Sequence, residues 1–263
     1  MKRARLIYNP TAGREEVRKR IPEILDILES AGFETSCHGT KGPGDAMRAA
    51  RKAVDSRFDL VIAAGGDGTV SEVINGLAEQ PYRPALGIIP AGTTNDFARA
   101  IGLPRSILKA TEVIAKGKAT PIDIGKINDK YFINIAGGGV LTTLTYEVPS
   151  KLKTLLGQMA YYMKGLEKLP SLTPIQMKIQ ADHYVIEDEI MMFLIANSNS
   201  VGGFEKIAPN ARLNDGMFDI LIIKKMSLPE FIRVATMALK GEHIHDPGVI
   251  YFQTKTLKAT SPE

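Results

Sequence analysis

The fold is decided by the stretch Leu60-Val-Ile-Ala-Ala-Gly-Gly-Asp-Gly-Thr-Val-Ser-Glu-Val-Ile-Asn75, where an apolar run breaks into glycines around one acid. Leu60–Ala64 has the length and composition of a buried strand. Apolar residues then recur at helical spacing, at Val70, Val73, Ile74 and Leu77. Gly65–Thr69 is therefore predicted to be a strand-to-helix turn, whose backbone N–H groups, helix dipole and glycines favour phosphate binding.

Strands and helical patterns alternate over residues 1–121. Further strands are predicted at Arg5–Tyr8, Phe33–Gly39 and Ala85–Ile89, and a helix at Asp45–Val54 with Asp45 as its candidate N-cap. This alternation indicates an α/β nucleotide-binding domain with a parallel sheet, whose ligand-binding loops follow the carboxyl ends of the strands. We therefore expect the loops at 9–13, 40–44, 65–69 and 90–96 to open on the same edge of the sheet.

From residue 122 to residue 263 the pattern predicts a mostly antiparallel β domain. The predicted strands are Ile122–Lys126, Tyr131–Ala136, Ile175–Ala181, Ile190–Ala196, Phe218–Ile223 and Val249–Ala259. Two helical stretches interrupt them, Tyr146–Leu169 and Leu228–Leu239. The run Gly137-Gly-Gly139 indicates either a close backbone approach or flexibility.

The composition is that of a globular protein, with 44% hydrophobic and 24% charged residues. The single cysteine excludes an internal disulfide, and no apolar run has the length of a signal peptide or a transmembrane helix, which predicts a cytoplasmic protein. A net charge of +4 and a pI near 9.0 allow attraction to phosphates, nucleic acid or an anionic membrane. Because Trp is absent and aromatic residues make up 6%, we predict no nucleic-acid partner.

The glycine turn has a plain structural alternative, since Thr69 and Glu72 match the capping box of a helix start. That alternative does not explain three glycines around Asp67 directly after a buried strand. A bare carboxylate would repel phosphates, whereas a bridging Mg²⁺ would remove the conflict. We therefore predict a Mg²⁺–nucleotide site, although the turn matches neither the Walker pattern nor the dinucleotide fingerprint.

Two other turns carry candidate side chains. Pro90–Arg99 presents Asn95 and Asp96 at the end of the next strand, where either residue would cap a short helix or contact the same ligand. Asp215 precedes a glycine, and a β-hairpin is the favoured interpretation over a cation site. The stretch Tyr146–Leu169 combines lysines with a leucine and methionine face, which is typical of a core helix and also of an interfacial membrane contact. The four histidines show no metal-ligand grouping.

Four motifs together resemble the diacylglycerol kinase catalytic family, most closely the soluble lipid kinases of Gram-positive bacteria that phosphorylate diacylglycerol. They are Asn9-Pro-Thr-Ala-Gly13, Gly65-Gly-Asp-Gly-Thr69 with Glu72 and Asn75, Pro90-Ala-Gly-Thr-Thr-Asn-Asp-Phe-Ala-Arg99, and Ala208-Pro-x-Ala-x-Leu-x-Asp-Gly216. The resemblance implies an α/β nucleotide domain at 1–121, a β-sandwich lipid-substrate domain at 122–263, and an active cleft between them.

By position, the resemblance implies a set of residues that contact ATP and others that hold metal. Asp67 and Asp96 would be catalytic and would organise Mg²⁺. A second, structural Mg²⁺ would be bound by Asp215 with the carbonyl oxygens of Arg212 and Met217. The ATP-binding residues would be Asn9, Pro10, Thr11, Ala12, Gly13, Thr40, Gly65, Gly66, Asp67, Gly68, Thr69, Val70, Ser71, Glu72, Thr93 and Asn95.

The family also carries a C-terminal Asp-Gly-Glu turn that supplies the general base, and nothing between Val249 and Glu263 matches it. We therefore expect the base beyond Glu263, expect the β-sandwich to be truncated, and leave open the activity of these 263 residues alone. The predicted reaction is ATP-dependent phosphorylation of diacylglycerol to phosphatidic acid on the inner, anionic face of the membrane. The alternatives are another acceptor such as NAD and a non-catalytic, nucleotide-responsive membrane module; a homodimer is also left open.

Overall fold

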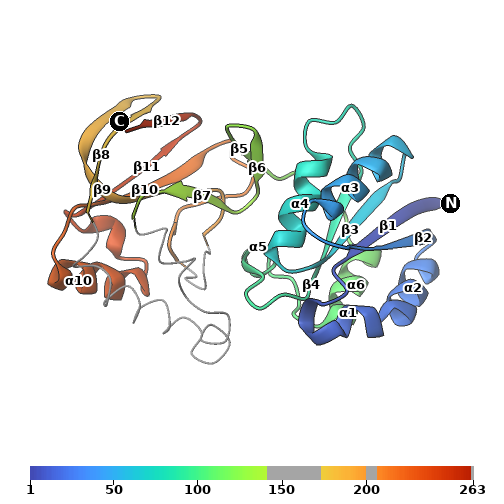
Figure 1. The fold of residues 1–263 in the computed structure, drawn as a ribbon. Coiled ribbons are helices and arrows are strands. Elements are labelled where there is room, and N and C mark those ends of the chain that lie inside the picture. The colour runs from blue at the N-terminus through green and yellow to red at the C-terminus, as the bar shows by residue number, and fades with distance from the viewer. Residues whose placement is uncertain (141–172, 200–205, 262–263) are drawn as a thin grey trace. The chain divides into compact units, whose positions relative to one another are not determined.

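The computed structural model describes residues 1–140, 173–199 and 206–261. The chain forms two compact units, Met1–Ile133 and Asn134–Glu263 (Figure 1). A functional domain boundary between residues 121 and 122 stays a prediction. No helix within the described ranges is long and apolar enough to cross a membrane. The predicted helix Tyr146–Leu169 lies outside the described residues.

The first unit is built on a parallel four-stranded sheet of order β2-β1-β3-β4. Every residue of the central strand β3 is buried, which is why this strand appears in the sequence as an unbroken apolar run. The predicted α/β alternation is thus confirmed. The strands are β1 (Lys2–Tyr8), β2 (Phe33–Gly39), β3 (Leu60–Gly65) and β4 (Ala85–Pro90).

Helices cover both faces of this sheet (Figure 1). On one face α2 (Ile21–Ser30) and α6 (Ile107–Lys116) pack together, and Leu6, Ile62 and Ile89 of the sheet lie in the core beneath them. On the other face α3 (Asp45–Asp55) packs along α4 (Asp67–Leu77). The shorter elements are η1 (Ala12–Glu15), α1 (Glu16–Lys19) and α5 (Asp96–Ala100). A small hairpin of β5 (Gly125–Ile127) and β6 (Lys130–Phe132) ends the unit.

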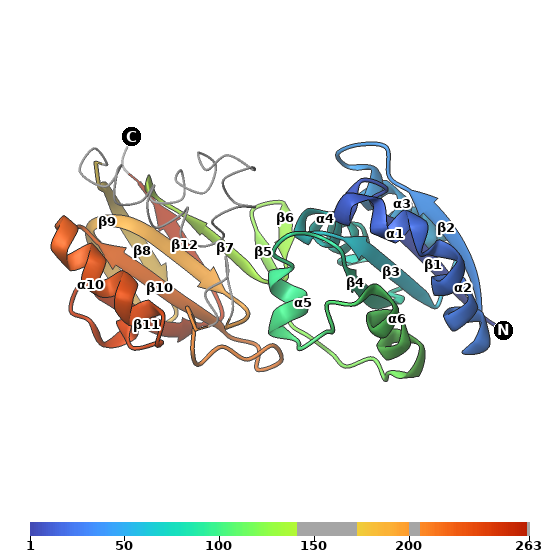
Figure 2. The same cartoon turned by 90° about the horizontal axis from the view of Figure 1, so that it is seen from below.

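The second unit is an antiparallel sheet of order β11-β10-β9-β8-β12, with β7 also paired to β9. Helix α10 (Leu228–Ala238) packs on the sheet through Val234 and Ala238 (Figure 2). The strands are β7 (Ile135–Gly138), β8 (Ile175–Ala181), β9 (Tyr184–Ala196), β10 (Phe218–Lys224), β11 (Val249–Thr254) and β12 (Leu257–Thr260), and a short helix η4 (His243–His245) precedes β11. The predicted antiparallel β domain is confirmed, although the single strands expected at Tyr131–Ala136 and at Val249–Ala259 are each divided between two strands.

The glycine run Gly137-Gly-Gly139 marks a close approach of two strands. A Cβ atom on Gly137 would lie 2.5 Å from the carbonyl oxygen of Phe193, and one on Gly139 would lie 2.6 Å from that of Met191. Gly139 also has a φ of 109°, which L side chains rarely adopt. Both observations favour close approach to β9 over flexibility.

Candidate nucleotide site

The loops that follow the parallel strands are held at one edge of the first sheet, as predicted. The backbone N–H of Asn9 donates to the carbonyl of Ala64 (3.0 Å), that of Thr40 to Tyr8 (2.9 Å), and that of Ala91 to Gly65 (2.9 Å). These bonds extend the pairing of the strands into the first residues of the loops. All of these loops therefore begin side by side at the carboxyl edge.

Glycines allow three of the turns to touch. A Cβ atom on Gly92 would lie 2.5 Å from the Cα atom of Gly66, so a side chain there would collide with backbone. One on Gly13 would lie 3.1 Å from the carbonyl oxygen of Ala91, and Gly13 has a φ of 57°. The turns 9–13, 65–69 and 90–96 thus meet only because these positions lack side chains.

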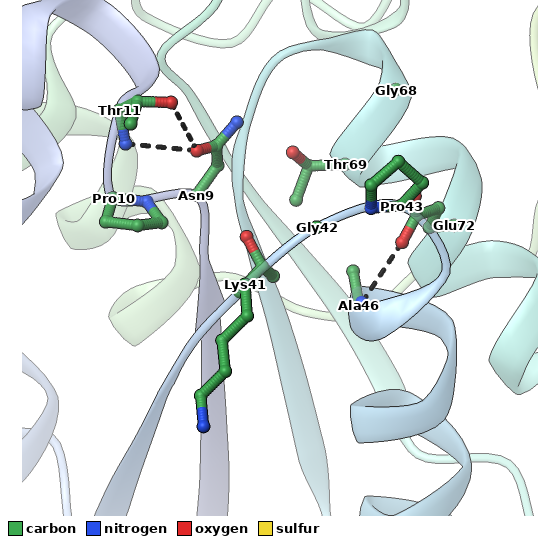
Figure 3. A pocket seen from close by; sticks show the side chains of 11 residues that line it. Asn9, Pro10, Thr11, Lys41, Gly42, Pro43, Ala46, Gly68, Thr69 and Glu72 are labelled. Carbon is green, nitrogen blue, oxygen red and sulfur yellow. Dashed lines mark hydrogen bonds between the residues drawn. The ribbon is translucent and has the colours of Figure 1, made fainter.

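A pocket of about 390 Å³ opens between the loops that follow β1 and β2 and the starts of α3 and α4 (Figure 3). Of the residues predicted to bind ATP, seven line it: Asn9, Pro10, Thr11, Thr40, Gly68, Thr69 and Glu72. Lys41, Gly42, Pro43 and Ala46 complete the lining. The first three belong to the loop 40–44 that was expected at this edge, although only Thr40 was named as an ATP contact, and Ala46 in the first turn of α3 was not predicted.

The remaining predicted residues lie on the same turns but outside the pocket lining. Asp67 is exposed and is the first residue of α4, next to Gly68 of the lining. Asp96 is half-buried and is the first residue of α5. Because Gly65 of β3 pairs with Pro90 of β4, both acids begin helices at neighbouring positions of one sheet edge. The others are Ala12, Gly13, Gly65, Gly66, Val70, Ser71, Thr93 and Asn95.

Side chains fix the shapes of two turns. The Asn9 side-chain oxygen accepts hydrogen bonds from the Thr11 backbone N–H (3.0 Å) and hydroxyl (2.9 Å), which closes the first turn (Figure 3). The Asn95 amide bonds both backbone groups of Gly92, accepting from its N–H (2.8 Å) and donating to its carbonyl (2.7 Å). Asn95 occupies the N-cap position of α5 with a φ of 50°. Its side chain makes no capping hydrogen bond to that helix.

The predicted capping box of Thr69 and Glu72 is wrong. Helix α4 begins at Asp67 with Gly66 as its N-cap, which leaves Thr69 inside the first turn. The Thr69 side chain instead packs on Gly65, where an added Cβ would lie 2.4 Å from its hydroxyl oxygen. The Glu72 carboxylate accepts hydrogen bonds from Gly44 N–H (2.8 Å) and Ala46 N–H (3.0 Å), so it caps the neighbouring helix α3.

Asp45 is not the N-cap of α3, because Gly44 occupies that position with a φ of 77°. The Asp45 carboxylate instead accepts from the backbone N–H of Lys41 (2.9 Å) and lies 3.2 Å from both His38 and Arg48 nitrogens. The Lys41 N–H, followed by His38 and Arg48, holds the pKa of Asp45 below its ordinary value against the opposing effect of burial. A negative Asp45 therefore anchors the Lys41 backbone at the pocket rim.

Comparison with known proteins identifies the family. Residues 3–127 match the profile of the diacylglycerol kinase catalytic domain, and residues 140–263 match that of the YegS C-terminal NAD kinase beta sandwich-like domain. A diacylglycerol kinase of Bacillus subtilis is 60% identical over all of this chain and 87% of its own length. The chain belongs to the diacylglycerol kinase family.

Other members of the diacylglycerol kinase family are also similar to this chain in sequence and in fold. The diacylglycerol kinase of Staphylococcus carnosus is 49% identical over the whole chain and 86% of its own length. A crystal structure of a diacylglycerol kinase from Bacillus anthracis superposes with a TM-score of 0.82 at 31% identity, covering all of this chain and 87% of that one. The resemblance drawn from the four motifs and the two-part fold class are therefore confirmed.

The turn around Asp215, which the diacylglycerol kinase motif includes, lies in the second unit. The Met217 N–H donates to the Asp215 side chain (3.0 Å), and Gly216 has a φ of 70°. No strand occurs between residues 206 and 217, so the hairpin interpretation is wrong. Within the described ranges, no three His, Cys, Asp or Glu side chains form a metal-binding group. A site of one carboxylate and the carbonyls of Arg212 and Met217 stays a prediction.

One buried acid near this turn was missed. Asp219 is 1% exposed and accepts hydrogen bonds from the Tyr251 hydroxyl and from Gln253 (3.2 Å). Burial raises the pKa of Asp219 and outweighs the hydrogen bonds from Tyr251 and Gln253, which lower it, while the nearby Asp215 also raises it. The sequence signal was an Asp inside the otherwise apolar strand Phe218–Ile223, because a buried acid is rarely kept without a partner.

Proposed function

We propose that this protein is an ATP-dependent lipid kinase that phosphorylates diacylglycerol to phosphatidic acid. One observation carries the proposal: in a chain of the diacylglycerol kinase family, three glycine turns meet beside a pocket of about 390 Å³ at the carboxyl edge of a parallel sheet. Such edges are where α/β proteins bind ligands. The printed names of the relatives support diacylglycerol as the acceptor.

The phosphates of ATP would lie at the start of α4. Gly66 and Gly68 present backbone without obstructing side chains, and the first N–H groups of a helix attract anions. The base and ribose would then extend toward Thr40 and the 41–46 segment of the lining. Holding the nucleotide in this orientation would be the main contribution of the protein to catalysis. Phosphoryl transfer depends chiefly on the positions of the reacting groups and on the neutralisation of their charge.

Asp67 and Asp96 would hold Mg²⁺ and its waters. Both supply carboxylate oxygens, the ligands that Mg²⁺ prefers, and both begin helices at the edge where the phosphates would lie, so the residues present fit the ion. When bound, Mg²⁺ would neutralise charge on the transferring phosphoryl group. Asp67 is exposed, so it can reach ligands without first leaving the core.

A second Mg²⁺ would have a structural role in the second unit. Asp215, with the carbonyl oxygens of Arg212 and Met217, offers oxygen ligands of the right chemistry on one short turn. The hydrogen bond from Met217 N–H already orients the Asp215 carboxylate toward its own turn. The donor set therefore fits a hard cation.

We also propose that the protein acts as a peripheral protein on the cytoplasmic, anionic membrane surface, where its lipid acceptor lies. The net charge of +4 supports attraction to anionic headgroups. Co-sedimentation with vesicles should therefore increase with their phosphatidylglycerol content and fall in high salt. Equal sedimentation with neutral vesicles would contradict this part of the proposal.

The reaction is tested by transfer of the labelled γ-phosphate of ATP to diacylglycerol in mixed micelles, with NAD as a competing acceptor. The 263 residues and a C-terminally extended chain are assayed in parallel, because the Asp-Gly-Glu turn of the family has no match here. We expect labelled phosphatidic acid that depends on Mg²⁺. Phosphorylation of NAD instead, or of no lipid by either chain, would overturn the proposal.

A further inference from the structure

The pocket of the first unit lies between the starts of two helices. Gly68 and Thr69 of its lining belong to the first turn of α4, and Ala46 belongs to the first turn of α3. Each helix start has backbone N–H groups without intrahelical partners and the positive end of a helix dipole. By general physics, a polyphosphate could therefore enter this pocket with its anionic end toward either helix.

Glu72 removes this ambiguity, because its two carboxylate oxygens face the start of α3. Oε1 accepts from Gly44 N–H at 2.8 Å and Oε2 from Ala46 N–H at 3.0 Å (Figure 3 shows the second bond). Gly44, the N-cap residue, has no side chain that could do this itself. The Glu72 carboxylate thus occupies the place where α3 would otherwise attract an anion. At the start of α4, Gly66 is the N-cap, and the exposed Asp67 that follows is the carboxylate to which we assign Mg²⁺, which would offset its repulsion of phosphates.

The packing of the two helices keeps Glu72 in this position. Gly76, one turn further along α4, is buried against α3: an added Cβ would lie 2.5 Å from the carbonyl oxygen of Met47 and 2.7 Å from the Cβ of Ala50. The buried side of α3 facing the core consists largely of alanines, which allows this close contact. The distance between Glu72 and the start of α3 is therefore set by backbone packing rather than by flexible side chains.

We infer that Glu72 is a positioning residue that fixes the direction in which the nucleotide binds. By capping α3, it makes the 40–46 side of the pocket unfavourable for phosphates and leaves the start of α4 as their place. The base then faces Thr40, Pro43 and Ala46. This inference rests on the proposed nucleotide binding. It adds that the orientation of the nucleotide depends on the Glu72 carboxylate, which acts by capping α3.

The test compares ATP with tripolyphosphate, which has the same anionic groups but no base. Both displace a fluorescent ATP analogue from the wild-type chain, from Glu72→Gln and from Glu72→Ala, and the ratio of their dissociation constants is measured. Releasing the start of α3 should tighten tripolyphosphate binding about tenfold, the size of one charged hydrogen bond gained at a second helix start. ATP should bind about as tightly as before, because placing its phosphates at that start would take its base out of the 40–46 side of the pocket.

Glu79→Gln is the matched control. It makes the same Glu-to-Gln change two residues beyond the end of α4, and it affects bonds from Tyr131 and Lys126, which lie outside the pocket lining. The ratio of ATP to tripolyphosphate affinity should stay at the wild-type value in this variant. A shift of equal size in Glu79→Gln would mean that loosening α4 is enough, and would overturn the inference.

The outcomes separate the inference from the proposed function. If the wild-type chain binds no ATP, the nucleotide site itself is wrong. If it binds ATP and the Glu72 variants keep the wild-type ratio, the site stands and the orienting role of Glu72 is wrong. Failure of both Glu72 variants to fold, followed by circular dichroism, would also overturn the inference, since Glu72 would then be a residue of general stability.

Discussion

The first unit holds a cavity of about 390 Å³ and the second unit one of about 410 Å³, but their walls are built differently. The first is lined by three segments that converge from separate loops and helix starts. The second is lined by Gln180–Asp182 at the end of β8 and Thr256–Lys258 at the start of β12, two strands that are already paired with each other. The two cavities therefore have similar volumes but are lined by different kinds of structural element.

Each cavity also contains a carboxylate that accepts a backbone N–H from a distant segment. Glu72 receives two such bonds from the start of a helix, whereas Asp182 receives one from Lys255 (2.9 Å) and hydroxyl bonds from Thr254 and Thr256 (2.8 Å each). The Asp182 donors belong to the turn that joins β11 to β12. We conclude that Asp182 stabilises a turn, whereas Glu72 caps a helix beside a pocket, where we propose that it directs phosphates to the start of α4.

The largest expected effect separates the two units by activity. Asp67→Asn should lower the rate of lipid phosphorylation about 100-fold or more, the usual loss when one electrostatic group at a transition state is removed. Its melting temperature should stay unchanged, because Asp67 is exposed. Asp182→Asn is the matched control and should retain the wild-type rate. Full activity of Asp67→Asn would contradict its assignment as a metal-binding residue.

A smaller effect concerns the contact between α3 and α4. Gly76→Ala should lower the free energy of unfolding by about 2 kcal/mol, because the new methyl group meets backbone and a buried alanine at less than van der Waals distance. Urea unfolding measures this. Gly68→Ala, in the same helix with no described atom within 4 Å of the new Cβ, should instead be about 0.5 kcal/mol more stable. Equal stability of the two variants would show that α3 moves aside without cost.

Much of the first unit could be predicted because its signals are local. The apolar run that became β3, the glycines of the turn and the helical spacing after it depend on neighbours in the sequence. The role of Glu72 could not be predicted, because its partners Gly44 and Ala46 lie 28 and 26 residues away. The local capping pattern with Thr69 fits the sequence equally well, and only the packing of α3 on α4 decides against it.

The second unit was harder to predict for a related reason. Val249–Ala259 has the composition of one long strand, yet Asp182 holds Lys255 and Thr256 in a turn that divides it. The turn at Asp215 had the sequence of a hairpin, but no strand precedes it within residues 206–217. At Val249–Ala259 the outcome depends on contacts with Asp182, which lies 73 and 74 residues away from Lys255 and Thr256 and which a local pattern does not contain.

The smallest expected effect is on stability against pH, and it tests the structural role of Asp182. The Lys255 N–H and the hydroxyls of Thr254 and Thr256 lower the pKa of Asp182 to about 2, below the value of about 3.9 in an unfolded chain. Its stabilising contribution is therefore complete above about pH 4 and is lost as the pH falls toward 2. The urea midpoint of the wild type should exceed that of Asp182→Asn at pH 7, and the difference should shrink between pH 4 and pH 2.5.

Thr256→Val sharpens this prediction, because it removes one hydroxyl donor and leaves the carboxylate and the Lys255 N–H in place. With fewer donors, the pKa of Asp182 should lie nearer its ordinary value, so the loss of stability on acidification should be smaller in total than in the wild type. A difference between wild type and Asp182→Asn that is the same at every pH would mean that the shape of the side chain, and not its charge, holds the turn. The contrast with Glu72, where we assign the effect to charge at a helix start, would then become stronger.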